Sequence, residues 1–279
     1  MLSTMQLTAA QIAMFQETVW DYYRTAGRAM PWRKHPEPYA VLVSELMLQQ
    51  TQVSRVLPKF EAFMRRFPTL AALAAAPLGE VLQAWSGLGY NRRAKFLHQA
   101  AQQIVAAHHG EVPRATGELT ALPGIGKNTA GAVLAYAFNQ PVVFIETNIR
   151  SVYIHHFFSD EQDVEDRALV QLIEQTLDHE HPREWYWALM DYGTHLKQTR
   201  GNNIAQSRHY TKQSRFAGSR RQLRGQILKA LVNGPVEREV LDEALQDQRF
   251  SVVVAELEQE GFLEQQGSVL KLTGMAELS

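Results

Sequence analysis

The segment that most constrains the fold is residues 122–131, LPGIGKNTAG, which separates two stretches of helical pattern. Gly124 and Gly126 allow a tight turn, and their lack of side chains leaves backbone N–H groups open at the start of the second helix. The helix dipole favours a phosphate at that position. A plain helix–turn–helix with glycines for close packing is an equal alternative, whereas the spacing to Lys127 is too short for a nucleotide-binding P-loop. The segment therefore predicts a helical hairpin and leaves phosphate contact open.

Most of residues 8–232 has the periodicity of helices. Apolar residues recur three and four positions apart in residues 69–85, 92–109, 127–138 and 165–177, as in amphipathic helices. Short segments with glycine or proline separate these stretches, and no repeat of about 20–50 residues is present. We therefore expect a mainly α-helical protein, and 279 residues suffice for two or three compact units.

The pattern changes near residue 218. Three short helical stretches, at 222–231, 236–245 and 250–260, precede two apolar strands separated by a Gly-Ser turn. This is the element order of a winged-helix domain, which we expect at 218–279. The helix that would enter a DNA groove carries Glu256, Glu258 and Glu260, and phosphates repel carboxylates. The domain is thus expected to pack, to dimerise or to recruit a protein partner rather than to read DNA.

Charge is distributed unevenly along the chain. The formal net charge is −1, which alone argues against a nucleic-acid-binding protein. Residues 192–236 nevertheless contain nine lysines and arginines and no aspartate or glutamate. Such a basic segment can neutralise phosphates. A solvated charged surface is the alternative, which the absence of interspersed acids disfavours.

The composition excludes several kinds of chemistry. The chain has no cysteine, which excludes disulfides, thiolate metal sites, iron–sulfur clusters and cysteine nucleophiles. Adjacent histidines such as His155 and His156 do not converge on one ion in a helix, so no metal site is expected. No run of about 18 apolar residues and no signal-peptide pattern is present. We expect a cytoplasmic protein with no membrane partner, associated with the nucleoid if the source is bacterial.

On its motifs, the chain resembles the endonuclease III superfamily of helix-hairpin-helix DNA glycosylases. The resemblance covers roughly residues 8–196 and includes PWR at 31–33, SELMLQQTQV at 44–53, WSGLGY at 85–90 and MDYG at 190–193. These segments are similar to the adenine glycosylase (MutY) branch. The resemblance implies a helix barrel at 30–140 and a second lobe at 141–217, joined by the N-terminal residues 1–29, with the substrate in a cleft between the lobes.

Two carboxylates are expected to carry the chemistry. Cleavage of an N-glycosidic bond needs a proton for the departing base and negative charge near the cationic sugar. Glu45 lies among apolar residues, where burial would raise its pKa, and the resemblance implies that it is the general acid. Glu146 stands where the superfamily has an aspartate that stabilises the sugar cation and positions water. Its extra methylene implies a reshaped pocket or a different substrate, and capping of the following helix is the alternative role.

Asn128 stands where the bifunctional members of the superfamily have a Schiff-base lysine. An amide cannot form an imine, and the neighbouring Lys127 points elsewhere on a helix, so we expect hydrolysis without lyase activity. Gly124, Gly126, Lys127 and Thr129 of the hairpin, together with Asn128, are expected to bind DNA. The superfamily also allows one alkali cation on hairpin carbonyls, although no side chain reveals it.

A duplex base must be flipped out to reach such a pocket. By resemblance, Gln50 fills the gap, Tyr90 stacks beside the opposite base, and Arg33 belongs to the DNA-binding set. Core or surface packing is the alternative for each. Asn91 replaces a second tyrosine that is common in the branch.

Two further departures from the family pattern concern its C-terminal half. The four-cysteine cluster of the family should follow residue 191, where Lys197, Ile204, Ser207 and Gln213 stand near the ligand positions. None of these binds iron as a thiolate does, so we expect no iron–sulfur cluster and a direct DNA contact by the basic segment. The family's module that senses 8-oxoguanine is not recognisable, and the winged-helix-like region stands in its place.

The sequence therefore predicts a monofunctional DNA glycosylase of base excision repair, without a cofactor. Its expected partner is double-stranded DNA with a damaged or mispaired base, and mispaired adenine is the leading substrate. Another damaged or deaminated base is the first alternative. A non-catalytic DNA-binding protein on the same scaffold is the second.

Overall fold

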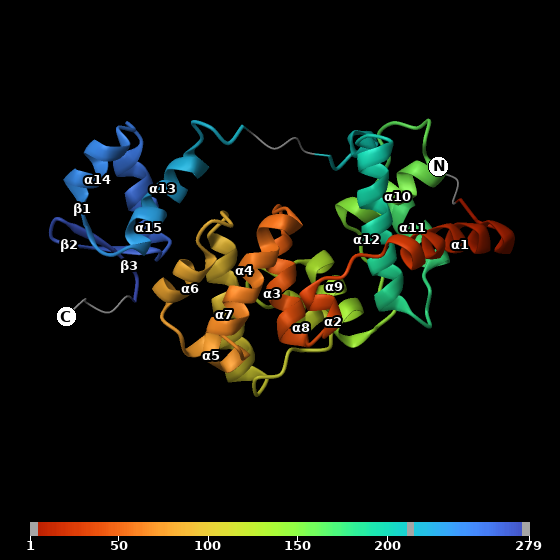
Figure 1. The fold of residues 1–279 in the computed structure, drawn as a ribbon, viewed down its shortest axis with the longest axis horizontal. Coiled ribbons are helices and arrows are strands. Elements are labelled where there is room, and N and C mark those ends of the chain that lie inside the picture. The colour runs from red at the N-terminus through yellow and green to blue at the C-terminus, as the bar shows by residue number, and fades with distance from the viewer. Residues whose placement is uncertain (1–4, 211–214, 275–279) are drawn as a thin grey trace. The chain divides into compact units, whose positions relative to one another are not determined.

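The computed structural model describes residues 5–210 and 215–274 of the chain. Helices dominate this part, and a small three-stranded sheet lies near its C-terminal end (Figure 1). The mainly helical fold expected from the periodicity is confirmed. The elements are α1 (Ala9–Ala26), α2 (Pro31–Lys34), α3 (Pro38–Leu48), α4 (Val53–Arg66), α5 (Leu70–Ala75), α6 (Leu78–Trp85), α7 (Arg92–Ala107), α8 (Thr116–Thr120), α9 (Lys127–Phe138), α10 (Thr147–Phe157), α11 (Asp166–Thr176), α12 (Pro182–Thr199), η1 (Asn203–Gln206), α13 (Arg220–Val232), β1 (Val236–Glu237), α14 (Arg238–Leu245), α15 (Phe250–Gln259), β2 (Leu263–Gln266) and β3 (Val269–Leu272).

Local sequence explains where several helices begin and end. α1 starts after a capping box, in which the Thr8 hydroxyl accepts from the Gln11 backbone N–H at 3.3 Å. α13 starts at Ser219, whose hydroxyl accepts from the Gln222 N–H. α9 ends at Asn139, a residue type that tolerates the left-handed conformation found there, with φ 53°.

The stretch at 69–85 is two helices rather than the single one that its periodicity suggests. α5 ends at Ala75, and α6 starts after Pro77. A proline disfavours helical conformation in the preceding residue and has no N–H for the helical ladder. Ala76 is accordingly extended, with φ −68° and ψ 146°. The other three expected helices are present as α7, α9 and α11.

The fold divides into two compact units. The first contains Met1–Glu45, Arg114–Ala121 and Ile125–Lys212, and the second contains Leu46–Pro113, Leu122–Gly124 and Gln213–Ser279. The boundaries expected from the sequence, near 30, 141 and 218, stay predictions. No helix of the described residues has the length and apolar character needed to cross a bilayer.

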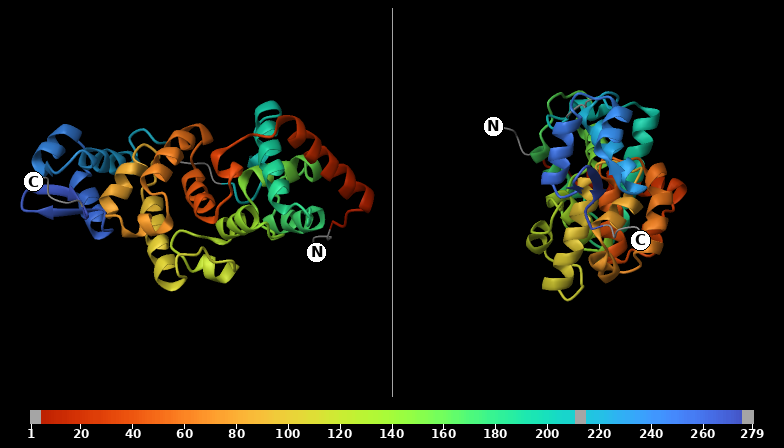
Figure 2. Two further views of the ribbon diagram at one scale, coloured as in Figure 1. Left: turned by 60° about the horizontal axis from the view of Figure 1, so that its bottom comes forward. Right: turned by 90° about the vertical axis from the view of Figure 1, so that its left-hand side faces the viewer.

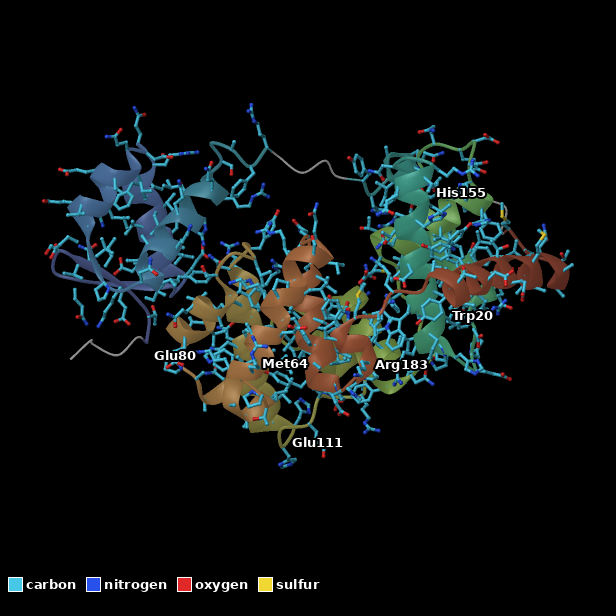
Figure 3. All side chains as sticks on the ribbon, in the orientation of Figure 1. Trp20, Met64, Glu80, Glu111, His155 and Arg183 are labelled. Atoms are coloured by element: carbon cyan, nitrogen blue, oxygen red, sulfur yellow. The ribbon has the colours of Figure 1, made fainter. Side chains whose placement is uncertain are left out.

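An aromatic cluster forms the core of the first unit. Phe15, Tyr153 and Trp185 are buried. Trp20, which Figure 3 labels on α1, has its ring centroid 5.8 Å from that of Trp185. These rings join α1, α10 and α12. All three side chains of the aromatic run at 185–187 are buried.

The second unit contains the helices α4–α7 and the C-terminal residues. Phe63 and Trp85 are fully buried, with ring centroids 6.0 Å apart. Towards the C-terminus, β2 and β3 form the expected hairpin, and β1 pairs with the other edge of β3. The sheet packs against the helices of the same region (Figure 2). The three expected helices are present as α13, α14 and α15, and the winged-helix assignment stays a prediction.

Candidate active site

Glu45 lies near the end of α3, a helix that is apolar on almost every side. Its neighbours Ser44 and Leu46 are fully buried, while the Glu45 side chain is partly accessible. Burial raises the pKa of Glu45 well above its usual value, the charge of Glu146 raises it further, and Arg33 opposes the rise. Glu45 can therefore carry a proton at neutral pH and deliver it to a group that enters from solvent.

Glu146 is the residue immediately before α10. Its side chain makes no capping hydrogen bond, so the capping role considered from the sequence is not observed. Burial raises the pKa of Glu146, whereas Arg150 and Lys197 lower it. Arg150 and Lys197 favour the ionised form of Glu146, whereas the charge of Glu146 disfavours the ionised form of Glu45, so the surroundings favour the proton on Glu45 and the negative charge on Glu146.

The cations around Glu146 are held by other residues of the first unit. Arg150 donates to both carboxylate oxygens of Asp166, at 2.8 and 2.7 Å. Lys197 Nζ donates to Asn148 Oδ1 at 2.7 Å. These contacts fix the start of α10, and with it the backbone that carries Glu146.

Arg33 is fixed by a buried aspartate. The two terminal nitrogens of Arg33 donate to the two oxygens of Asp191, at 2.8 and 2.9 Å. Arg28 donates to the same carboxylate through its backbone N–H and its Nε, both at 2.8 Å. The Arg33 guanidinium also lies over the Trp187 ring, 5.4 Å from its centroid. Arg33 therefore has an internal role here, and its expected DNA contact stays a prediction.

Tyr136 is a site residue that the sequence reasoning missed. It is buried on α9, and burial raises the pKa of its hydroxyl well above the usual value. The charges of Glu146 and Glu45 raise it further, which keeps the phenol protonated. Its position in the apolar pattern of α9 indicated core packing and gave no signal of this electrostatic interaction.

Gln50 and Tyr90 occupy two turns of the second unit, both with left-handed backbone. Their φ angles are 56° and 49°, a conformation that costs free energy in residues other than glycine and is enriched at functional sites. Gln50 is exposed and Tyr90 is partly exposed. The structure thus gives both predicted DNA contacts an unusual local geometry.

Arg93, which the sequence reasoning also missed, connects these two turns. Its guanidinium is buried, and burial lowers its pKa to about 10, so it remains charged at neutral pH. The guanidinium carbon lies 5.4 Å from the Tyr90 ring centroid. The Arg93 side chain therefore donates hydrogen bonds to the end of α3, to the Gln50 turn and to the Tyr90 turn. Its acceptors are the carbonyls of Leu46 (2.7 Å), Met47 (2.8 Å), Gln49 (2.6 Å) and Gly89 (3.0 Å) and the hydroxyl of Thr51 (3.0 Å).

The predicted helical hairpin is present between α8 and α9. Gly124 has φ 76°, and a Cβ atom there would lie 2.7 Å from Phe96 Cβ, so the turn needs glycine for both conformation and space. Gly126 precedes α9 without a capping side chain, and Lys127 and Asn128 are exposed. Thr129 is partly buried. The start of α9 thus has the open N–H groups that suit an anion.

The four residues that stand near the expected cluster-ligand positions do not suit an iron–sulfur cluster. Ile204 and Ser207 are buried, Lys197 bonds Asn148, and Gln213 lies outside the described residues. Polar contacts with other residues of the first unit hold this segment in place instead. The Asn203 side chain donates to the Ser151 carbonyl at 2.9 Å, and Ser207 forms a β-bridge with Val164. In the described residues no group of three potential metal-binding side chains is found.

Part of the basic segment is neutralised by acids from elsewhere in the chain. Arg208 pairs with Asp163 and Glu165, and Arg224 pairs with Glu260 at 2.7 Å. The direct DNA contact expected of this segment stays a prediction, and these cations already have protein partners.

Comparison with known proteins agrees with the resemblance. A family model described as "HhH-GPD superfamily base excision DNA repair protein" matches residues 43–175. The adenine DNA glycosylase of Buchnera aphidicola subsp. Baizongia pistaciae is 36% identical over 182 residues, which are 64% of this chain and 52% of that protein. The Mycolicibacterium smegmatis enzyme of that name is 47% identical over 133 residues, 47% of this chain and 45% of its own length. The chain thus spans about half the length of these curated relatives.

Solved structures show the same fold. A thermostable thymine-DNA glycosylase matches with a TM-score of 0.59 and 25% identity, over 65% of this chain and 85% of that one. Endonuclease III in a non-covalent DNA complex matches with a TM-score of 0.54 and 22% identity, over 70% of this chain and 87% of that one. The expected endonuclease III-type fold is therefore confirmed. Residues 43–175 of the chain thus match the HhH-GPD superfamily of base excision DNA repair proteins, and the chain is similar to the adenine DNA glycosylases.

Proposed function

We propose that the chain is a monofunctional DNA glycosylase that hydrolyses the N-glycosidic bond of mispaired adenine in double-stranded DNA. The observation that carries this proposal is the carboxylate pair of Glu45 and Glu146, which share one environment but differ in their neighbouring cations. Two carboxyl groups whose surroundings separate their proton affinities are typical of an acid and an electrostatic partner. The adenine DNA glycosylases among the relatives support the choice of base.

In this mechanism the two carboxyl groups act on the two ends of the breaking bond. Protonated Glu45 donates to a ring nitrogen of the flipped adenine, so that the base departs as a neutral molecule. Ionised Glu146 stabilises the oxocarbenium-like sugar, orients the water that adds to it and accepts the proton that this water loses. Tyr136 keeps its proton and can donate a hydrogen bond within the site. The products are free adenine and an abasic site.

The DNA contacts in this proposal come from turns and a helix start. Gln50 fills the space of the flipped base, and Tyr90 stacks beside the opposite base, as aromatic side chains stack on unpaired bases. The hairpin N–H groups and Lys127 bind phosphate. Backbone carbonyls of the same hairpin turn are the proposed ligands of an alkali cation. Absence of lyase activity follows from Asn128, because an amide does not form an imine.

A panel of duplexes tests the proposal under single-turnover conditions. It contains adenine opposite guanine and opposite 8-oxoguanine, together with uracil, hypoxanthine and oxidised pyrimidines, and alkali reveals abasic sites afterwards. We expect adenine release that Glu45→Gln abolishes and that Glu61→Gln, the same change at an exposed position on α4, leaves intact. Silence across the panel with DNA still bound would refute catalysis, and a borohydride-trapped strand break would refute the monofunctional mechanism.

A different excised base is the second candidate. Glu146 is one methylene longer than the aspartate of the family pattern, which moves its carboxylate relative to the sugar. A thymine-DNA glycosylase is also among the similar structures. Release of a base other than adenine in the panel would keep the mechanism and change the substrate.

A further inference from the structure

A cavity of about 110 Å³ lies in the first unit, between the ends of α10 and α12 and the short helix η1. An apolar cavity of about 150 Å³ can hold a benzene molecule, so this one has room for a small polyatomic ligand. Leu196, which is buried, supplies an apolar part of its lining. The polar residues that line it are His155 (labelled in Figure 3), Ser159, Arg200, Asn203 and Gln206.

Two amide side chains fix the walls of the cavity. Gln206 Nε2 donates to three backbone carbonyls at and after the end of α10, at 2.8–3.3 Å. Asn203 Nδ2 donates to the Ser151 carbonyl, and its Oδ1 accepts from the Ser151 hydroxyl. These bonds tie η1 to α10 and already engage both amides. New contacts to a ligand therefore fall to the remaining polar residues of the lining.

The lining carries positive charge, and no described aspartate or glutamate is part of it. Arg200 makes no ion pair with any described residue, whereas Arg150 and Arg208 of the same unit each meet a carboxylate. Burial lowers the pKa of His155, and the charge of Arg200 lowers it further. The charge of Arg200 thus acts on a ring that lines the same cavity. An unbalanced positive charge beside a cavity without acids favours an anionic ligand.

The backbone after α12 adds hydrogen-bond donors to the cavity. Arg200 is right-handed, with φ −114° and ψ −4°, and Gly201, which also lines the cavity, is left-handed, with φ 87°. Consecutive residues of these two conformations turn their N–H groups towards a common point, an arrangement that binds anions. The Gly201 N–H and the Ser159 hydroxyl have no hydrogen-bond partner among the described residues. The dipole of α12 puts about half a negative charge at this end, which the full charge of Arg200 exceeds.

We propose that the cavity is a binding site for a free phosphate-type oxyanion, held by the Arg200 guanidinium, the Gly201 N–H and the Ser159 hydroxyl. A guanidinium presents planar paired donors that match two oxygens of such an anion. The phosphodiester of a DNA backbone has the same chemistry, but the sugars on its two sides exceed a cavity of about 110 Å³, which favours the free anion. The anion would join α10 to the turn after α12, where the superfamily pattern places cluster ligands that this chain lacks. This site goes beyond the proposed function and does not depend on it.

Thermal unfolding of the whole chain in inorganic phosphate, compared with chloride of equal ionic strength, tests the inference. A ligand that binds only the folded state raises the midpoint, by about 3–6 °C at a phosphate concentration ten times its dissociation constant. Isothermal titration calorimetry measures that constant. Arg200→Ala should weaken phosphate binding at least about tenfold, the loss expected for a hydrogen bond to a charged group. Ser159→Ala removes an exposed hydroxyl and keeps every charge, and it should weaken binding about three- to tenfold.

Arg167→Ala is the matched control. Arg167 is an exposed arginine on α11 of the same unit and lies outside the lining of the cavity, so its loss should keep the phosphate affinity of the parent chain. A phosphate-induced rise of equal size in the parent chain, Arg200→Ala and Ser159→Ala would overturn the inference, because exclusion of the salt from the protein surface stabilises all variants alike. Absence of any rise over chloride would overturn it as well.

A saturating undamaged duplex distinguishes the two sources of phosphate. Unchanged phosphate affinity in its presence supports the free anion as the occupant. Loss of phosphate binding on addition of the duplex would assign the site to the DNA backbone and overturn the inference. Since none of these measurements involves base excision, a failure of the proposed function would leave their outcome unaffected.

Discussion

Substitution of Gly193 by alanine should displace Glu146 without touching it. Gly193 on α12 faces the backbone of α10, and a Cβ atom there would lie 2.4 Å from the carbonyl oxygen of Asn148 and 2.8 Å from its carbonyl carbon. Ordinary contact between such atoms is about 3.3–3.6 Å, so the two helices must separate by roughly 1 Å. Overpacking of this kind costs about 1–3 kcal/mol.

The expected effect on the reaction is larger than the effect on stability. Asn148 lies two residues after Glu146, so a shift of the α10 start moves the carboxylate with it. Misplacement of a catalytic group by about 1 Å can reduce a rate about 100-fold. The midpoint of thermal unfolding should fall by about 2–12 °C. Single-turnover excision measured well below that midpoint separates the two effects.

Gly225→Ala provides the control for this prediction. Gly225 lies within α13, and a Cβ atom there would meet nothing within 4 Å. The alanine should therefore stabilise the helix by about 0.5–1 kcal/mol and leave the excision rate unchanged. If Gly193→Ala kept both the melting temperature and the rate of the parent chain, the close approach of α10 and α12 would not position Glu146, and the reasoning would be wrong.

Four further predictions concern protonation and buried charge. The single-turnover rate should follow a bell-shaped pH profile, with an acid limb near pH 7 where Glu146 gains a proton and an alkaline limb where Glu45 loses one. Folding raises the pKa of both Glu45 and Glu146, so at these two groups the folded chain binds more protons than the unfolded chain. Their contribution to the free energy of unfolding therefore falls as pH rises above about 4.5. Glu45→Gln should thus raise the melting temperature more at pH 8 than at pH 5. Asp191→Asn should cost about 3–5 kcal/mol in urea unfolding because it leaves two arginines without their buried anion, whereas Asp21→Asn, in an exposed pair, should cost less than about 1 kcal/mol. Arg93→Lys should lower the excision rate at least about tenfold, with little change in Glu45-dependent pH behaviour, because three donors of an ammonium cannot serve five acceptors in two turns.

The sequence predicted those features that depend on local periodicity and turn chemistry. The helices, the C-terminal hairpin and the turn at Gly124 all follow from patterns within a few residues. Apolar periodicity alone was misleading at Pro77, because the apolar spacing continues through this residue although the proline breaks the helix. Glu45 was predicted from its motif and its apolar neighbours rather than from any contact.

The features that the sequence did not predict depend on contacts between distant segments. Tyr136 and Arg93 have ordinary positions in amphipathic helices, and only tertiary packing within each unit determines what each of them meets. The pairing of charged side chains also depends on contacts between distant segments. Arg208 and Arg224 form part of a basic segment in the sequence, but in the fold each meets a carboxylate from another segment. A one-dimensional charge pattern cannot separate a cation available to phosphate from one already paired.

Arg33 links the stability of the first unit to the acidity of Glu45. A buried carboxylate is stable only with its cations, and Asp191 therefore fixes the Arg33 guanidinium through two hydrogen bonds. The fixed positive charge opposes the rise in the pKa of Glu45 that burial and Glu146 produce. Without it, Glu45 would hold its proton too strongly to be an efficient acid, because proton transfer is most effective when the pKa of the donor lies near the working pH. The proton affinity of Glu45, the proposed acid, thus depends on an aspartate that acts on it only through a shared arginine.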